Sequence, residues 1–357
     1  MDHAGRRDRL RRALADVDAI LVTSLTSTRY LTGFSGSHGA VVLTSRASDD
    51  RLGTDFRYVT QVETECPGIE VAVDRDAAAA LTSYAEQLGA TRLGIEAAHL
   101  SVAARDALAA AHPAMELVPL TGTVEALRIT KDDDELAAVA EACRLTDAGL
   151  AALLPEVRPG LTERQVARRL ENLMLDAGAD AISFETIVAA GPHSAIPHHS
   201  PTDRPIEAGD LLKIDFGALH AGYHADETRT FVVGRAPEAW QADLHALVAE
   251  AQRAGREALG VGATYSDVDD AARSVIRDAG HAQHFGHGLG HGVGLDIHEA
   301  PFLGAAADGI LGDRTPVTVE PGVYLPGRGG VRIEDTLVVR TGGPVSLTQT
   351  TRELLVL

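Results

Sequence analysis

Residues 287–299, HGLGHGVGLDIHE, combine the histidines His287, His291 and His298 with four glycines at alternating positions. Such a composition is poor for a helix and unusual for a strand, because glycine contributes no side chain to packing in either. Imidazole groups bind metals, transfer protons near neutral pH and donate hydrogen bonds to developing charge. Glycine also lets a backbone and a substrate approach closely, so we expect this stretch to form one wall of an active site.

A second group of chemically capable residues consists of carboxylates on predicted strands. Residues 211–233 are predicted to form a β-hairpin whose loop centres on His220 and Ala221. In that register Asp215 and Asp226 face each other with Cβ atoms about 5 Å apart, and two like charges so placed repel. No lysine or arginine is an obvious partner at that depth of the hairpin. A divalent metal would remove the conflict, because carboxylates suit hard and borderline cations.

Two further carboxylates lie near the C-terminus. Glu320 ends the apolar segment of VTVEPGVY, and GVRIEDTLVV is predicted as a strand with Arg332 and Glu334 on one face and Asp335 on the other. Buried strands rarely carry carboxylates without partners. Each of these acids alone is most simply a turn or surface residue. Together with the two acids of the hairpin and one histidine they match a two-metal hydrolytic site with ions about 3.5 to 4 Å apart.

Length and composition limit the class of protein. The chain has 357 residues, beyond the usual domain of about 100 to 200, which predicts two domains. Its formal net charge of −19 argues against a nucleic-acid partner, and no apolar run reaches the roughly 18 residues of a membrane span. No export signal is visible, and Cys66 and Cys143 lack a disulfide or metal spacing. We therefore expect a cytoplasmic protein without a membrane partner.

The order of predicted elements places the domain boundary. Short apolar strands alternate with alanine-rich helices from Ala19 to about Val124, which predicts an α/β domain over residues 1–124. A helix follows Thr130, with an acidic first turn that the helix dipole favours. In residues 125–357 helices come first and strands later, a pattern typical of an α+β domain.

Taken in order, the motifs resemble the dinuclear-metal peptidases of the pita-bread fold, which include methionine aminopeptidase, aminopeptidase P and prolidase. The resemblance is carried by IPHHSPTDR, DFGALHAGYHADETRTF, HGLGHGVGLDIHE, TVEPGVY and VRIED. TRYLTGFSGS, TDFRY and RITKDDDEL resemble the amino-terminal domain and linker of the last two enzymes. The resemblance implies a pita-bread, creatinase/aminopeptidase-like α+β catalytic domain after a smaller α/β creatinase-type domain.

Carried over position by position, the resemblance implies five metal ligands for two divalent ions per chain. Asp215 would bind one ion, Asp226 and Glu334 would bridge both, and His291 and Glu320 would complete the second. The nucleophile would be a metal-bridging hydroxide and Glu320 the proton shuttle. One nitrogen and several oxygens suit Mn²⁺, the expected metal, with Co²⁺ and Zn²⁺ as alternatives.

The resemblance also implies roles for residues around the ions. His198 and His298 match positions that hydrogen-bond the substrate and the tetrahedral intermediate, and Arg332 would orient Glu334. His287 matches a histidine of aminopeptidase P and prolidase that methionine aminopeptidase generally lacks. Surface or packing roles are expected for His199, His220, His224, His281 and His284.

The implied activity is hydrolysis of the peptide bond preceding proline by a homodimeric enzyme. Xaa-Pro dipeptides, as for prolidase, are the expected substrates. The alternatives are an aminopeptidase P acting on longer Xaa-Pro peptides and a catalytically silent peptide- or protein-binding module. The silent module predicts loss of a metal ligand, and none is lost. Creatinase shares the fold but lacks the metal set.

The sequence does not identify the residue that binds the C-terminal carboxylate of the substrate. A dipeptidase needs a cation for the free carboxylate, ideally a bidentate arginine. Arg29, Arg57, Arg314 and Arg328 are candidates that spacing does not rank. Glu227 stands where the family usually has an apolar residue, and GDRTPVTVEPG replaces a commoner Gly-Met-rich approach to Glu320; both departures concern substrate recognition more than catalysis.

Overall fold

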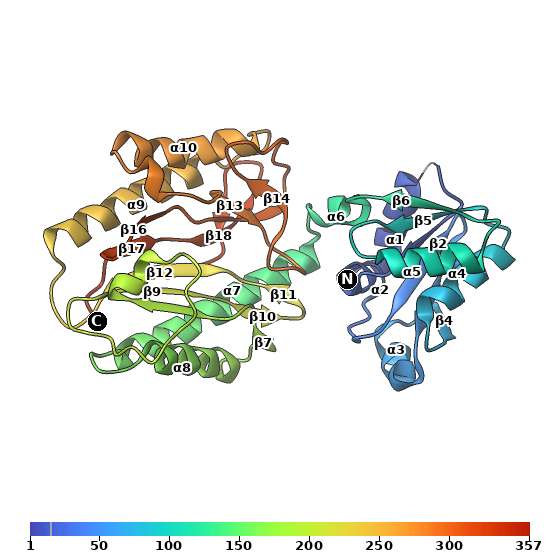
Figure 1. Ribbon diagram of the computed structural model, residues 1–357, viewed down its shortest axis with the longest axis horizontal. Helices are drawn as coiled ribbons and strands as arrows, with labels where there is room; N and C mark the ends of the chain where they lie inside the picture. Colours follow the sequence, from blue (N-terminus) through green and yellow to red (C-terminus); the bar gives the residue numbers. More distant parts are fainter. Residues whose placement is uncertain (15) are drawn as a thin grey trace. The chain divides into compact units, whose positions relative to one another are not determined.

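The computed structural model describes residues 1–14 and 16–357, and the chain divides into two compact units, Met1–Arg128 and Ile129–Leu357 (Figure 1). The division expected between residues 124 and 125 falls inside α6 (Thr123–Arg128). This helix packs against the first two helices of the first unit, and the carbonyl of Leu127 accepts a hydrogen bond from the Tyr30 hydroxyl at 3.0 Å. The first unit therefore keeps α6 and ends after it.

The first unit is one mixed six-stranded sheet with helices packed on it. The strand order is β4-β3-β2-β1-β5-β6, with β1 antiparallel to β2 and parallel to β5. The strands are β1 (Ala19–Val22), β2 (Ala40–Thr44), β3 (Arg51–Thr54), β4 (Glu70–Val73), β5 (Arg92–Glu96) and β6 (Glu116–Leu120). The helices before α6 are α1 (His3–Ala13), α2 (Leu25–Thr32), α3 (Val59–Glu65), α4 (Ala77–Gln87) and α5 (Val102–Ala111).

The second unit has two helix pairs outside its strands, which form four small sheets (Figure 1). Apolar faces of α7 and α8 pack on the sheet β12-β9-β8, and those of α9 and α10 on the strands around β15 and β18. The helices are α7 (Asp133–Leu153), α8 (Glu163–Asp176), α9 (Ala239–Ala258) and α10 (Tyr265–Asp278). Capping boxes at Asp132 and Thr162 begin α7 and α8. No helix in the described part of the chain is long and apolar enough to span a membrane.

The strands of the second unit lie between the helix pairs. They are β7 (Ala181–Ile182), β8 (Ile187–Ala190), β9 (Leu211–Phe216), β10 (Ala218–His220), β11 (Tyr223–His224), β12 (Glu227–Val232), β13 (Gly290–Gly292), β14 (Glu299–Leu303), β15 (Thr315–Val319), β16 (Gly322–Leu325), β17 (Gly329–Arg332), β18 (Asp335–Val339) and β19 (Val345–Ser346). Among them, β8, β9, β13, β14 and β17 contribute residues to the lining of one cavity.

The expected hairpin forms, but the strand register that we expected for it was wrong. The turn lies at Ala221 and Gly222, both with positive φ, one residue later than expected. Such a two-residue turn favours glycine at its second position, which moves the loop centre toward Gly222. Asp215 therefore pairs with Thr228, and Asp226 is its diagonal neighbour on the same face.

The segment GVRIEDTLVV is interrupted and does not form a single strand. β17 pairs with β16, β18 pairs with β15, and Ile333 and Glu334 lie between the two strands. On the partner segment, Glu320 and Pro321 lie between β15 and β16. Proline has no N–H group with which to continue the ladder. Both ladders keep one register, so Glu320 and Glu334 face each other at the interruption.

A buried histidine makes the stability of the second unit depend on pH. His245 on α9 is 6% exposed, and burial lowers its pKa from 6.5 to about 4. His245 is protonated at a higher pH in the unfolded chain than in the folded chain. The stability that comes from burying the neutral imidazole is therefore lost as the pH falls below 6.5. Between pH 7 and pH 5 we expect the wild type to lose about 2 kcal/mol more unfolding free energy than His245→Leu, measured by urea denaturation. Equal losses in both proteins would contradict this account.

Candidate metal centre

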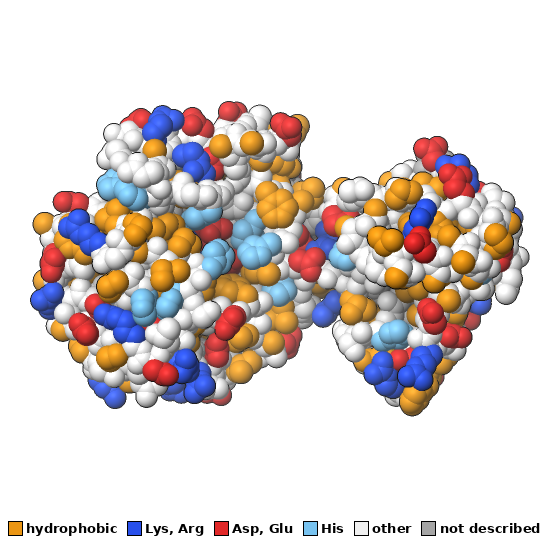
Figure 2. All heavy atoms as spheres, viewed as in Figure 1, with side chains coloured by type: hydrophobic (Ala, Val, Ile, Leu, Met, Phe, Trp, Pro, Cys, Tyr) orange, Lys and Arg blue, Asp and Glu red, His pale blue; other side chains and the backbone are white. Residues whose placement is uncertain are grey.

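The five residues expected as metal ligands come from the β9–β12 hairpin, from β13 and from the C-terminal ladders, and they meet in one cavity of about 580 Å³ in the second unit. Asp215 is on β9, Asp226 precedes β12, His291 is on β13, and Glu320 and Glu334 sit at the interruption between the C-terminal ladders. His198, His287 and His298 also line the cavity. Figure 2 shows histidines gathered around a hollow with acidic side chains inside it.

The ligand atoms are close but are not hydrogen-bonded to each other. One ligand atom each from Asp226, His291 and Glu334 lies within 4.8 Å of the others. His291 Nε2 is 3.6 Å from Asp226 Oδ2 and 3.3 Å from Glu320 Oε1. All of these side chains except that of Glu320 are buried, and Glu320 is largely so.

Burial and mutual repulsion destabilise the charged forms of these acids. Burial, followed by the charges of Glu334 and Asp215, raises the pKa of Asp226 well above its ordinary value. Burial, followed by Glu320 and Asp215, does the same for the pKa of Glu334. Burial raises the pKa of Glu320 to about 7 and lowers that of His291 to about 4. The imidazole of His291 is therefore neutral at physiological pH.

The hydrogen-bond pattern fits a cation among these groups. His291 Nδ1 lies 3.0 Å from the carbonyl of Gly292, which only accepts, so Nδ1 carries the proton and Nε2 presents a lone pair to the carboxylates. Asp215 Oδ1 is buried and has no hydrogen-bond partner among the described residues. Lone pairs that face each other in this way repel, whereas a divalent ion attracts all of them. The donor set of one nitrogen and several carboxylate oxygens suits Mn²⁺, Co²⁺ or Zn²⁺.

Arg332 supplies a cation that the hairpin alone does not reveal. Its Nη2 donates to Asp215 Oδ2, so the hairpin acid has a basic partner from another strand that was not an obvious candidate in the sequence. Arg332 Nε donates to the Thr228 hydroxyl at 3.0 Å, which in turn donates to Glu334 Oε2 at 2.6 Å. Arg332 thus contacts Asp215 directly and reaches Glu334 through Thr228. Tyr324, which the motifs did not single out, accepts from Arg332 Nη1 at 2.9 Å.

The remaining histidines of the cavity differ in their partners. His287 Nδ1 lies 2.8 Å from the carbonyl of Gly288 and its Nε2 3.0 Å from the Tyr324 hydroxyl, so both ring nitrogens are already engaged. The exposed His298 ring packs edge-on against His291, with centroids 4.4 Å apart. His199, expected as a surface or packing residue, is buried and bonds Glu163 Oε2 at 2.9 Å.

The alternating glycines serve strand packing more than substrate approach. A Cβ at Gly290 would lie 2.1 Å from the Thr318 carbonyl oxygen, and one at Gly292 would lie 2.3 Å from that of Ala300. Real Cβ atoms do not approach backbone oxygens so closely, so β13 is held against its neighbours by residues without side chains. This packing brings His291 to the acids.

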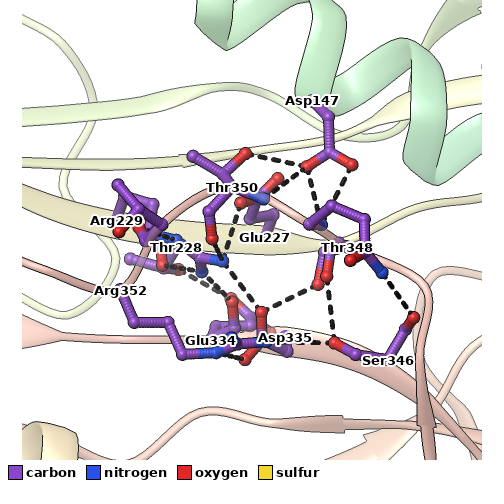
Figure 3. A network of polar contacts seen from close by, with 12 residues as sticks. Asp147, Glu227, Thr228, Arg229, Glu334, Asp335, Ser346, Thr348, Thr350 and Arg352 are labelled. Carbon is purple, nitrogen blue, oxygen red and sulfur yellow. Dashed lines mark hydrogen bonds and ion pairs between the residues drawn. The ribbon is translucent and has the colours of Figure 1, made fainter.

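Behind the carboxylates, a buried polar network joins the sheet to the C-terminal segment (Figure 3). Arg229 donates to Asp335 Oδ1 at 2.8 Å and to the carbonyl of Glu334, and Arg352 donates to the other oxygen of Asp335. Glu227 pairs with Arg229 at 3.0 Å, and burial raises its pKa to about 8. Glu227 therefore belongs to this network and does not line the cavity.

The two units and the site define a two-domain metallopeptidase of the pita-bread type. The family model for metallopeptidase family M24 matches residues 137–341, and that for the Creatinase/Prolidase N-terminal domain matches residues 6–130. The chain belongs to metallopeptidase family M24. The expected family, fold class and enzyme class are confirmed.

Relatives with two named activities resemble the chain over nearly its full length. It is 35% identical over 340 residues to the Xaa-Pro dipeptidase of Pyrococcus horikoshii, with 95% of each chain covered. The structure of the Xaa-Pro dipeptidase from Bacillus anthracis gives a TM-score of 0.94 at 37% identity, covering 99% of this chain and 100% of that one. The X-Pro aminopeptidase from Thermotoga maritima gives 0.91 at 32% identity, covering 98% and 99%.

Removing one acid from the cluster should have opposite effects in metal-free and metal-loaded protein. We expect Glu334→Gln to weaken metal binding roughly 100-fold, measured by calorimetry and metal analysis. It should raise the Tm of the metal-free protein, because it removes a buried, repelled acid. The matched control Glu141→Gln changes an exposed acid that pairs with Arg144 and should alter neither quantity. Two tightly bound ions and full activity in Glu334→Gln would show that Glu334 is not a ligand.

Proposed function

We propose that the chain hydrolyses the peptide bond preceding proline, with Xaa-Pro dipeptides as its preferred substrates. The observation that carries this proposal is the convergence of Asp226, Glu320 and Glu334 on the lone pair of His291, in a cavity that Asp215 also lines. The Xaa-Pro dipeptidases of Pyrococcus horikoshii and Bacillus anthracis, similar over nearly their whole lengths, support the choice of substrate.

The proposed ligands divide between two ions. Asp215 would hold one, Asp226 and Glu334 would be shared by both, and His291 and Glu320 would complete the second, with Mn²⁺ as the proposed metal. When bound, two divalent ions lower the pKa of water toward neutrality and polarise the scissile carbonyl. The neutral imidazole of His291 is already in the protonation state that a ligand needs.

Side chains of the cavity wall bind and orient the substrate. His198 and His298 are exposed on the wall and have no recorded hydrogen-bond partner among the described residues, so their N–H groups are free to donate to a substrate carbonyl. Glu320 is proposed to carry the proton to the leaving amine. Arg332 holds Asp215 and, through Thr228, Glu334 in place.

Aminopeptidase P activity is the second candidate, and the lining of the cavity favours it. Among the described residues that line the cavity, Arg332 is the one lysine or arginine, and Asp215 already pairs with it. The lining also includes the apolar side chains of Phe184, Ile187 and Phe302. Such a lining suits a continuing peptide better than a free carboxylate.

Two of the arginines expected to bind a substrate carboxylate have other partners within the second unit. Arg314 contacts Asp133 at 2.6 Å, and Arg328 lies 4.2 Å above the Trp240 ring. Neither lines the cavity. Arg29 and Arg57 belong to the first unit.

A cytoplasmic homodimer remains our proposal, and sedimentation velocity tests the dimer.

A comparison of two peptides with and without metal tests the function. We expect the Mn²⁺-loaded chain to cleave Ala-Pro faster than Ala-Pro-Ala, and the chelated protein to cleave neither. Ala-Ala serves as the control dipeptide and should stay intact. Cleavage of Ala-Pro-Ala alone would establish aminopeptidase P activity in place of dipeptidase activity, and no cleavage of any proline peptide would refute the proposal.

A further inference from the structure

Glu163, the first residue of α8, is a fully buried carboxylate outside the metal centre. Five donors surround it. Oε1 accepts from Ala190 N at 2.8 Å and lies 2.9 Å from His193 Nδ1. Oε2 lies 2.9 Å from His199 Nε2 and accepts from Thr202 N at 3.0 Å and Thr202 Oγ1 at 2.6 Å. Burial alone would raise the pKa of Glu163, but the hydrogen bonds from Thr202 and Ala190 lower it to about 2.

All five donors belong to one segment, residues 190–202, so a single carboxylate ties together both ends of it. The segment includes the short helix at Gly191–Ala195 and then the cavity-lining residues His198 and His199. Glu163 therefore fixes a stretch of chain that has little regular secondary structure of its own.

The middle of the segment is held from its other side. Lys213 Nζ donates to the carbonyls of Ile196 at 2.6 Å and Pro197 at 3.2 Å. Arg332 Nη1 also donates to the Pro197 carbonyl, at 3.2 Å. His198 follows directly, and its ring has no recorded partner among the described residues. Where the His198 imidazole points is thus decided by the backbone that carries it.

An alternative interpretation is that Glu163, His193 and His199 bind a metal ion, because one ligand atom from each lies within 4.8 Å of the others. The hydrogen bonds argue against it. Both carboxylate oxygens are occupied by donors, including two N–H groups of the backbone that cannot reverse direction. Ala190 and Thr202 take three of the roughly four lone-pair sites of the carboxylate, and N–H groups of His193 and His199 account for its remaining contacts without an ion.

We propose that Glu163 is a positioning residue that fixes the backbone of residues 196–199 so that His198 faces the reacting centre. The inference rests on the proposed function of His198 as a substrate contact. An amide at position 163 would turn an NH₂ group toward donors that now meet an oxygen, and the segment would loosen. A small displacement of a substrate-binding group lowers kcat while leaving the ions in place.

A double-mutant cycle on the Mn²⁺-loaded full chain tests the proposal. We expect Glu163→Gln to lower kcat for Ala-Pro about 10-fold with little change in KM and with two ions per chain. In a His198→Ala background the same change should cost less than about 2-fold, because the residue it positions is gone. Glu156→Gln is the matched control: it removes a partly exposed acid that precedes α8 and pairs with Arg169 of that helix. It should leave kcat unchanged.

Three further readouts keep the test decisive. If Glu163→Gln fails to fold, Thr202→Val removes one of the five donors and should show the same coupling to His198 at smaller amplitude. A full 10-fold loss in the His198→Ala background would overturn the proposal, as would a third ion per chain that Glu163→Gln removes.

The NMR ring signal of His198, assigned by its absence in His198→Ala, should be single in the wild type and broadened in Glu163→Gln. An unchanged signal would overturn the inference even if the wild type cleaved no proline peptide.

Discussion

Repulsion among buried carboxylates is the constraint on which the second unit depends. Four acids and the lone pair of His291 share one cavity, and burial together with their mutual charge raises the pKa of Asp226 and Glu334. Removing such charges from water costs several kcal/mol per ion unless a partner compensates. Arg332 pairs directly with Asp215 alone, and its charge offsets only part of the burial of Asp226 and Glu334. The remaining charge is neutralised by protons, as the raised pKa values of Asp226 and Glu334 indicate, or by bound cations, and such a cluster marks a candidate place of chemistry.

The scaffold keeps these groups together by fixing backbone rather than by pairing side chains. Glu320 and Glu334 face each other where one long hairpin is interrupted on both strands. Arg229 holds the carbonyl of Glu334 and also those of Thr350 and Thr351, so the C-terminal segment closes the back of the site (Figure 3). The helix pairs outside the sheets bury the apolar faces and leave the inner face to the acids.

The sequence predicted the fold class correctly and singled out residues that the structure brings into one cavity, but it predicted their geometry less well. All five expected ligands line the cavity, because their motifs combine residue types that few other chemistries require. The hairpin register was off because the turn lies at Gly222, and GVRIEDTLVV was read as one strand because apolar periodicity does not show a change of partner. Arg332 was assigned to Glu334, its neighbour in sequence, although its direct contact is Asp215.

The sequence by itself determined the class of protein, the two-domain order and the donor types, because these depend on which residues are present and on their local spacing. The tertiary structure decided which atoms face each other. Arg332 and Asp215 are 117 residues apart, and Glu163 meets donors 27 to 39 residues away. Glu163 carried no signal beyond a helix start, since its role exists only once the segment that carries His198 folds over it. Long-range packing sets such contacts, and local patterns do not encode it.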